Sequence, residues 1–422
     1  MQVIAFDFFA KMVLSSADIK IMKNLIYLLI LPVVALYGCS SIEDPSLEKK
    51  SKNAAEMRAA QKQARRNAVE EDRFEALTGG LPSKLSHANM VEIGKGKLLK
   101  IAKSDSASII GSVSSDGGAT WSSDFILKYE DGSKILNPNS YPQIYKMANG
   151  TLALLFYNNS SKSYSGGNPI WISGGRIDAS GDVKWSQPEI LVYNKNYERN
   201  FSLPNLLEKD NSAWILTRSG KRGVLNRASP RVLRAVSNPV DNVLATRDLV
   251  FNPRAFKNGG ATFVMPKLKD VSKHGITIDF VARFTDSSVG KLVFDNMDNS
   301  GKGIQVLTDK NRSLRVIVND GKTKLDWTTD TEMFQPGKLA HIAIILDGRA
   351  NVLMSVANGK LNDGNGLRPF GWYSFYGEIG SVNGAIRAEV GRADGVEIKR
   401  FRIYSRALLV SEVLSNYRYE RM

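Results

Sequence analysis

The sequence has little of the two residue types that build most disulfide and metal sites. It contains one cysteine, Cys39, and three histidines, His87, His274 and His341. A single cysteine cannot form a disulfide within the chain, and the three histidines are not spaced as ligands of one metal ion. We therefore expect no intramolecular disulfide, no metal and no cofactor, and we interpret the histidines as structural or surface residues.

The chain also has no nucleic-acid-binding motif, although basic residues outnumber acidic ones. Its 57 lysines and arginines and its 42 aspartates and glutamates give a formal net charge of +15 at pH 7. Without a nucleic-acid module, such a balance suits anionic lipid head groups or acidic glycans. We expect a carbohydrate or glycoconjugate and a membrane as partners, and no nucleic acid. The 422 residues are enough for two or three domains.

The apolar run near the N-terminus is too short to cross a membrane as a stable helix. Residues 25–36 are mostly apolar, follow Lys23, and lead to Cys39 and Ser40. This pattern is typical of a secretory signal, whereas a buried helix ending in an inert thiol is the alternative. Its end resembles a bacterial lipobox. The resemblance implies that residues 1–39 are upstream residues and a signal peptide, that Cys39 is lipidated, and that the protein is anchored in the cell envelope, at the outer membrane or cell surface.

Residues 40–82 are polar and rich in glutamate, lysine, arginine, glutamine and alanine. Good helix formers with few large apolar residues predict a solvated helical linker, which ends at Gly79, Gly80 and Pro82. After this linker, short β-patterned runs begin, and an all-β fold is predicted for the rest of the chain. We divide it into residues 83–245 and residues 251–422.

The first of these regions contains a repeated hairpin. Residues 90–101, 141–156 and 203–216 each show two short apolar runs separated by a turn of glycine, asparagine or aspartate. Such turns suit β-hairpins, and the copies recur about every 50 to 60 residues, a period typical of propeller blades. The pattern predicts about three blades.

One turn in the first repeat carries a more specific pattern, Ser-x-Asp-x-Gly-x-Thr-Trp. An aspartate can accept hydrogen bonds from the amides of its own turn, glycine tolerates positive φ, and the tryptophan ring can pack between strands. The pattern resembles the Asp-box of sialidase-type β-propellers, and residues 178–185 resemble a worn second copy. The resemblance implies a structural role, not catalysis, for Ser114, Asp116, Gly118, Thr120 and Trp121.

Three blades are fewer than a closed propeller has, typically four to eight. Either the chain takes a covering surface from elsewhere, or this is the remaining part of a longer propeller. The stretch around Trp171 and Trp185 is similar to the later part of bacterial exo-sialidase-like proteins. Active members of that family hold a sialic acid carboxylate with three arginines and use a tyrosine nucleophile activated by a glutamate.

The family's active-site positions are replaced in this sequence. Where the family has glutamate and arginine in the first repeat, the chain has His87 and Lys103, and the tyrosine position holds Leu203, or Phe201 if the register slips by two. None of these side chains supplies the bidentate clamp or the nucleophilic oxygen. We expect no catalytic residues. Tyr193 or Tyr197 could replace the missing phenol, although a tyrosine in a strand or loop is more often a packing residue.

The C-terminal region, residues 251–422, alternates apolar and polar residues between Asn-Gly and Asp-Gly turns, which predicts an antiparallel β-sandwich. The order of a strand at 341–347, a second at 352–357 and a closing strand before Tyr404 and Leu408 resembles a laminin-G-like, concanavalin-like jelly roll. The resemblance implies that Tyr404 and Leu408 enter the core. A short helix follows, with Ser411 as its expected N-cap.

Modules of this kind appended to sialidases usually bind carbohydrate. Because sugars stack on exposed aromatic faces and bind planar polar groups, we take Trp372, Tyr373 and Tyr376 as candidate glycan-binding residues, with Arg368 to bind an acidic group. The alternative is that Trp372 and Tyr373 fill the sandwich core.

Three functions remain open from the sequence. The first is a surface lipoprotein that binds a glycan, sialylated or otherwise acidic, without cleaving it. The second is an active exo-sialidase whose arginines come from unrecognised positions, for example Arg218, Arg222, Arg227 and Arg231. The third is a decayed sialidase paralogue without selected activity.

Overall fold

The computed structural model describes residues 89–138, 141–158, 167–194, 202–209, 212–219, 222–253, 256, 260–364, 371–391 and 395–421. All of them lie within one compact unit, Gly80–Met422. The predictions for the signal peptide, Cys39, the linker, His87, Tyr197, Phe201 and Arg368 therefore fall outside the described residues. Within the described part, no helix is long and apolar enough to cross a membrane.

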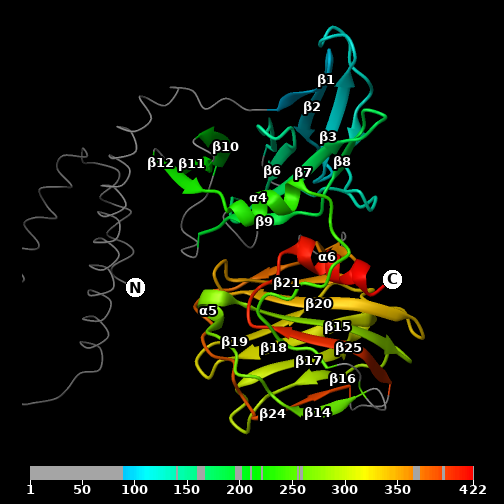
Figure 1. Cartoon of the computed structure of the whole chain (residues 1–422), viewed down its shortest axis with the longest axis vertical. Coiled ribbons are helices and arrows are strands. Elements are labelled where there is room, and N and C mark those ends of the chain that lie inside the picture. Colours follow the sequence, from blue (N-terminus) through cyan, green and yellow to red (C-terminus); the bar gives the residue numbers. More distant parts are fainter. Residues whose placement is uncertain are drawn as a thin grey trace, which may run out of the picture. The chain divides into compact units, whose positions relative to one another are not determined.

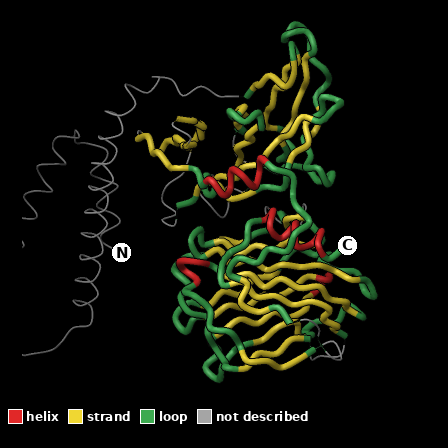
Figure 2. Tube along the Cα trace, viewed as in Figure 1, coloured by secondary structure: helices red, strands yellow, loops and turns green. Residues whose placement is uncertain are grey.

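The described chain is all-β, with antiparallel sheets, as predicted, and Figure 2 shows how few helices interrupt the strands. The first sheet has the order β1-β2-β3-β4 and is made of consecutive strands. These strands are β1 (Met90–Gly94), β2 (Lys97–Lys103), β3 (Ile109–Ser114) and β4 (Phe125–Ile126). Gly96, with φ of 71°, allows the tight turn between β1 and β2.

The second and third sheets are again built from consecutive strands. The second contains β5 (Gln143–Lys146), β6 (Leu152–Phe156), β7 (Ile170–Ile177) and β8 (Val183–Trp185), with β9 (Glu189–Val192) paired to β7. The third contains β10 (Ser202–Lys209), β11 (Ser212–Ser219) and β12 (Arg222–Arg227), and the helix α4 (Pro230–Ser237) follows it. The three predicted hairpins correspond to the pairs β1–β2, β5–β6 and β10–β11.

The C-terminal region is a sandwich of two antiparallel sheets (Figure 1). The seven-stranded sheet contains β13 (Leu249–Phe251), β25 (Val396–Tyr404), β15 (Ile276–Phe284), β20 (Leu339–Asp347), β21 (Val352–Ala357), β22 (Lys360–Leu361) and β23 (Tyr373–Ser374). The six-stranded sheet contains, in spatial order, β14 (Ala261–Val264), β24 (Arg387–Val390), β16 (Leu292–Asp295), β17 (Gly303–Asp309), β18 (Ser313–Asn319) and β19 (Lys324–Thr328). Three short helical segments complete it: α5 (Val271–His274), η2 (Lys310–Arg312) and α6 (Val410–Tyr419).

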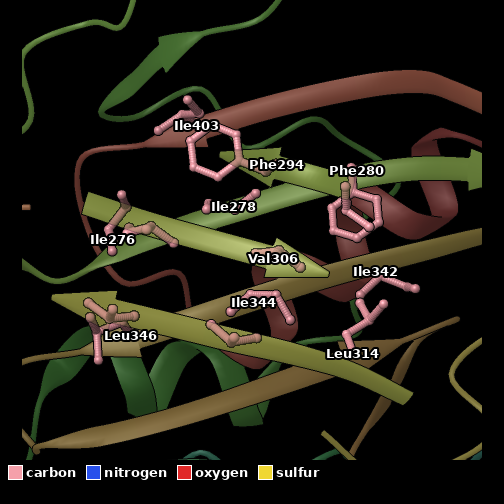
Figure 3. Close-up of a cluster of buried hydrophobic side chains, with 14 of the residues drawn as sticks. Ile276, Ile278, Phe280, Phe294, Val306, Leu314, Ile342, Ile344, Leu346 and Ile403 are labelled. Carbon is pink, nitrogen blue, oxygen red and sulfur yellow. The ribbon is translucent and has the colours of Figure 1, made fainter. Parts of the chain in front are cut away.

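Alternating residues of the two sheets form the core between them. Phe280 on β15, Phe294 on β16 and Phe401 on β25 are fully buried there, with ring centroids of Phe294 and Phe401 5.4 Å apart. Figure 3 shows part of this core, gathered from strands of both sheets. Tyr404 and Leu408 are buried, but in a second cluster on the other side of the seven-stranded sheet and not in this core as predicted. The helix α6 begins at Val410 with Leu409 at its N-cap, so the prediction that Ser411 is the N-cap is wrong.

The outer face of the seven-stranded sheet is also buried. Ala343 and Ile345 on β20, whose neighbours along the strand face the sandwich core, belong to a second buried cluster. This cluster also contains Val410 of α6 and, from the second sheet of the N-terminal region, Phe156 and Trp171. The regions predicted as two domains therefore share buried apolar surface, and the N-terminal sheets gain a covering surface from the sandwich.

Candidate ligand-binding surfaces

The Asp-box residues form a closed hydrogen-bonded turn after β3. The Asp116 carboxylate accepts hydrogen bonds from the Ser114 hydroxyl (2.7 Å), from the Thr120 N–H (2.9 Å) and from the Thr120 hydroxyl (2.6 Å). Trp121 Nε1 donates to the carbonyl of Gly118 (3.1 Å), which has a φ of 99°. The bonds from Thr120, followed by that from Ser114, hold the pKa of Asp116 well below its ordinary value. The carboxylate is thus engaged within its own turn, which suits a structural role.

The second turn of this type, at residues 178–185, is similar in its contacts. Asp178 accepts hydrogen bonds from the N–H groups of Ser180 and Asp182, both at 3.0 Å, and Gly181 has a φ of 80°. Trp185 is buried, whereas Trp121 is half-buried. Lys97 on β2 donates to the Gly181 carbonyl at 2.9 Å. This turn is therefore joined directly to the first sheet.

Of the positions expected for sialidase catalysis, Lys103 is the one whose side chain lies among the described atoms. Lys103 is exposed at the end of β2, and Leu203 lies on β10, with its side chain outside the described atoms. Tyr193 is 38% exposed, and its pKa is raised by burial and by the charge of Asp347. A raised pKa keeps the phenol protonated, the opposite of what activates a nucleophile.

The arginines considered for an alternative carboxylate clamp have separate partners where they are described. Arg231 pairs with Glu412 of α6. Arg227 donates to the Ser212 hydroxyl (3.1 Å) and lies over the Trp214 ring, 5.9 Å from its centroid. The side chains of Arg218 and Arg222 lie outside the described atoms.

The aromatic loop after residue 370 divides into a buried and an exposed part. Trp372 is only 1% exposed, donates from Nε1 to the Asn158 carbonyl (3.0 Å), and lies 5.5 Å from Trp171 between ring centroids. Its ring is therefore a core element, which corrects the expectation that it stacks on a sugar. Tyr373 and Tyr376 are 37% and 70% exposed and stay candidates.

The exposed part of this loop is fixed to the edge of the six-stranded sheet. The N–H of Gly380 donates to Asp320 Oδ2 at 2.7 Å, and Asp320 lies in the turn between β18 and β19. Gly377 lies near Thr323 of that turn, since a Cβ placed on this glycine would be 3.7 Å from the Thr323 hydroxyl oxygen. Tyr376, next to Gly377, is thus held beside one end of this sheet.

The outer face of the six-stranded sheet carries a row of mostly polar residues that the sequence reasoning did not single out. Strand pairing places six side chains across all six strands, in the order Thr262, Glu389, Asp295, Gln305, Ile317 and Asp326. Gln305 Nε2 donates to Asp295 Oδ2 (2.7 Å), and Arg315 binds both oxygens of Asp326 (2.8 and 2.5 Å). These planar polar groups flank the apolar side chain of Ile317.

This face is open where the corresponding face of the other sheet is covered. On β17, β18 and β19 the residues facing the core are buried, while Gln305, Arg315 and Asp326 are half-buried or exposed. On β20, by contrast, every residue except Leu339 is buried. Polar and apolar residues alternate along the strands of residues 303–328. This alternation is typical of a sheet with one solvated face, and it could have indicated this face from the sequence.

The described residues contain no group of three or more histidine, cysteine, aspartate or glutamate side chains arranged to hold a metal ion. Asp347, in a turn of the sandwich, instead binds the Arg349 guanidinium through both oxygens, at 3.1 and 3.0 Å. The candidate binding surfaces among the described residues are sheet faces, loops and pockets.

Comparison with known proteins identifies the C-terminal region. Residues 257–414 match the family model of the concanavalin A-like lectin/glucanases superfamily, and they form a concanavalin A-like, laminin-G-type domain. No curated protein sequence matches the chain.

Similarity to solved structures is distant. The chain is similar to the Ruminococcus gnavus IT-sialidase CBM40 bound to α2,3-sialyllactose, at 13% identity and a TM-score of 0.30, over 40% of this chain and 97% of that one. It is also similar to Trypanosoma rangeli sialidase, at 13% identity and a TM-score of 0.29, over 79% of this chain. The chain covers 62% of the length of that sialidase.

Proposed function

We propose that this protein binds glycans without cleaving them and is held in the cell envelope by a lipid on Cys39. The observation that carries the proposal is a concanavalin A-like domain at residues 257–414 whose six-stranded sheet has an open polar face. Sugar hydroxyls are recognised by planar polar side chains. Gln305 on β17 and Arg315 on β18 supply such groups on neighbouring strands, and Ile317, which is 8% exposed, lies beside both.

The exposed tyrosines add an aromatic surface to this face. Tyr376 is 70% exposed on a loop that Asp320 fixes to the β18–β19 turn. A sugar that lies along the polar row can stack on this ring at the end of the row. The formal net charge of +15 belongs to the whole chain and raises the concentration of anions around it, which favours an acidic glycan such as a sialylated one. The row itself carries three carboxylates, Glu389, Asp295 and Asp326, with Arg315 beside them.

The three N-terminal sheets are, in this proposal, a partial sialidase-like propeller that no longer performs hydrolysis. Two Asp-box-like turns support the propeller interpretation, and Lys103 and Leu203 at the expected arginine and tyrosine positions support the loss of hydrolysis. The shared buried cluster explains how so few blades remain covered.

Glycan-array binding followed by calorimetry, with the chain from Ser40 onward, tests the proposal. We expect binding to acidic glycans, and we expect Tyr376→Ala and Gln305→Ala each to weaken it about tenfold, the effect of losing one stacking or hydrogen-bonding contact. Tyr419→Ala, on α6 and 46% exposed, is the matched control and should leave binding unchanged.

A fluorogenic sialic acid glycoside separates binding from catalysis. We expect no turnover by the natural chain or by Lys103→Arg. Turnover by the natural chain, or the absence of binding to every glycan on the array, would contradict the proposal.

A further inference from the structure

A pocket of about 360 Å³ lies between the first sheet and the Asp-box-like turn of the second sheet. Its lining comes from the first sheet, residues 127–130 and Gly132 on one side, and from residues 181–185 on the other. None of these residues belongs to the sandwich. The pocket is therefore separate from the open sheet face, and its occupant goes beyond the proposed function.

Two glycines shape the apolar walls of this pocket. A Cβ on Gly111 of β3 would lie 2.6 Å from Leu127 and 3.2 Å from Phe125, both of which line the pocket. A Cβ on Gly175 of β7 would lie 2.7 Å from the ring of Trp185. Real Cβ atoms do not come so close to their neighbours. Glycine at both positions therefore leaves room for Leu127, Phe125 and Trp185 to lie over the neighbouring strand.

Three lysines contribute positive charge to the lining. Lys97 Nζ donates to the Gly181 carbonyl at 2.9 Å and keeps donors for other partners, since an ammonium has three. Lys184 Nζ lies 3.3 Å from Asp178. Lys128 is exposed and makes no salt bridge to any described residue. Lys128 is thus the cation most available to a ligand.

The lining contains two acidic residues. Glu130 pairs with Arg176 at 3.3 Å. Asp182 Oδ2 lies 3.2 Å from the Ser180 hydroxyl, which donates its single proton to Asp178 at 2.5 Å. Three lysines and two carboxylates give the lining a net charge of +1. The pocket is therefore electrostatically suited to one negative charge.

Two aromatic residues of the lining have unusual environments. Phe125 is 44% exposed, although phenylalanine is normally buried. Tyr129 is 4% exposed, and its hydroxyl has no hydrogen-bond partner among the described residues. Burial raises the pKa of Tyr129 well above its ordinary value, so this hydroxyl stays protonated and able to donate.

From these observations we infer that the pocket binds a small organic carboxylate with an apolar face, with the carboxylate beside Lys128 and the apolar face against Phe125. The volume of about 360 Å³ is at the lower end of the range for ligand pockets, and it suits one or two rings. A sugar acid and an aromatic acid share this chemistry.

Ligand-observed NMR titration of the full-length chain in detergent tests the inference. The probes are N-acetylneuraminic acid and glucuronic acid for sugar acids, benzoate for aromatic acids, and N-acetylglucosamine as the neutral comparator. We expect saturable binding of one carboxylate class, which identifies the source, and no binding of the neutral sugar. Phe125→Ala and Lys128→Glu should each weaken the affinity for that carboxylate about tenfold.

Lys95→Glu is the matched control, because Lys95 is exposed in the β1–β2 turn and does not line the pocket. An equal loss in Lys95→Glu and Lys128→Glu would overturn the inference, as would no saturable binding of any carboxylate. Lys128→Gln, with its melting temperature, replaces Lys128→Glu if the reversal of charge disturbs folding. Tyr376→Ala should leave pocket binding unchanged, so failure of the sandwich face and failure of the pocket are distinguishable.

Discussion

The two sheets of the sandwich share one core but differ in what lies on their outer faces. The outer face of the seven-stranded sheet carries Ala343 and Ile345 and is buried together with α6 and side chains of the N-terminal sheets. The outer face of the six-stranded sheet carries Gln305 and Arg315 and is open. One face thus joins the parts of the chain, and the other is solvent-facing.

The loop after residue 370 carries both buried and exposed aromatic residues. This loop reaches both surfaces. Trp372 enters the buried cluster on one side, while Gly377 and Gly380 lie beside the β18–β19 turn on the other. A single loop therefore stabilises the covered face with one aromatic ring and carries another, the exposed Tyr376, near the β18–β19 turn of the six-stranded sheet.

The largest expected effect is on the covered face. Trp372→Ala removes a buried ring that contacts Trp171 and leaves a cavity, so we expect the free energy of unfolding to fall by about 3 to 5 kcal/mol. Urea unfolding followed by circular dichroism measures it. Tyr376→Ala, at the open face, is the control and should change stability by less than about 0.5 kcal/mol. Equal effects of the two substitutions would show that the faces do not differ as described.

The next effect concerns a buried carboxylate of the N-terminal region that binds the start of α6. Glu189 of β9 accepts the N–H groups of Val410 (3.0 Å) and Ser411 (2.8 Å), at the start of α6. Burial raises the pKa of Glu189 to about 7, although these N–H groups act to lower it. A raised pKa means that the folded protein holds a proton that the unfolded chain has released between pH 4.5 and pH 7. Stability from this group is therefore full below pH 4.5 and is lost as the pH rises through 7.

We expect the free energy of unfolding of the natural chain, compared with Glu189→Gln, to decrease by about 3 kcal/mol between pH 4 and pH 8. The comparison is needed because buried acids with lowered pKa, such as Asp279 beside His341 and Arg402, act in the opposite direction. Chemical unfolding at several pH values measures it. Parallel curves for the two proteins would mean that folding does not shift the pKa of Glu189.

Local patterns predicted much of the fold. The alternation around residues 276–284 and 341–347 predicted strands of a sandwich, and turns of glycine, asparagine and aspartate placed the hairpins. These features can be predicted from short stretches of sequence, because the alternation in a strand and the geometry of a turn depend on residues that are close together in the chain.

Contacts between distant segments were not predictable in the same way. Nothing near Trp372 in the sequence distinguishes it from Tyr376, because its burial depends on Trp171 and Asn158. Likewise, Ser411 has the residue type of an N-cap, but Glu189 from another sheet binds the N–H groups there. The alternation of polar and apolar residues indicates a sheet with one polar face. Which of the two sheets is covered depends on contacts with the N-terminal region, and the local sequence does not show these.

The smallest expected effect compares two isoleucines at corresponding places. Ile345 lies on the outer face of the seven-stranded sheet and is 0% exposed, and Ile317 lies on the outer face of the six-stranded sheet and is 8% exposed. Ile345→Ala should cost about 2 to 4 kcal/mol, because the surrounding cluster cannot close the cavity. Ile317→Ala should cost at most about 1.5 kcal/mol, because its neighbours on the open face can move and water can reach the site.

The difference of about 2 kcal/mol between the two substitutions reports the covering of one face alone, since residue type, strand geometry and the sandwich core are the same in both. Urea unfolding of both variants measures this difference in the free energy of unfolding. Glycan titration of each variant then shows whether the same face binds the ligand. Ile317→Ala should weaken binding at the open face and Ile345→Ala should not. A large loss of stability from Ile317→Ala would mean that a surface covers the six-stranded sheet as well, and the ligand would then have to bind elsewhere.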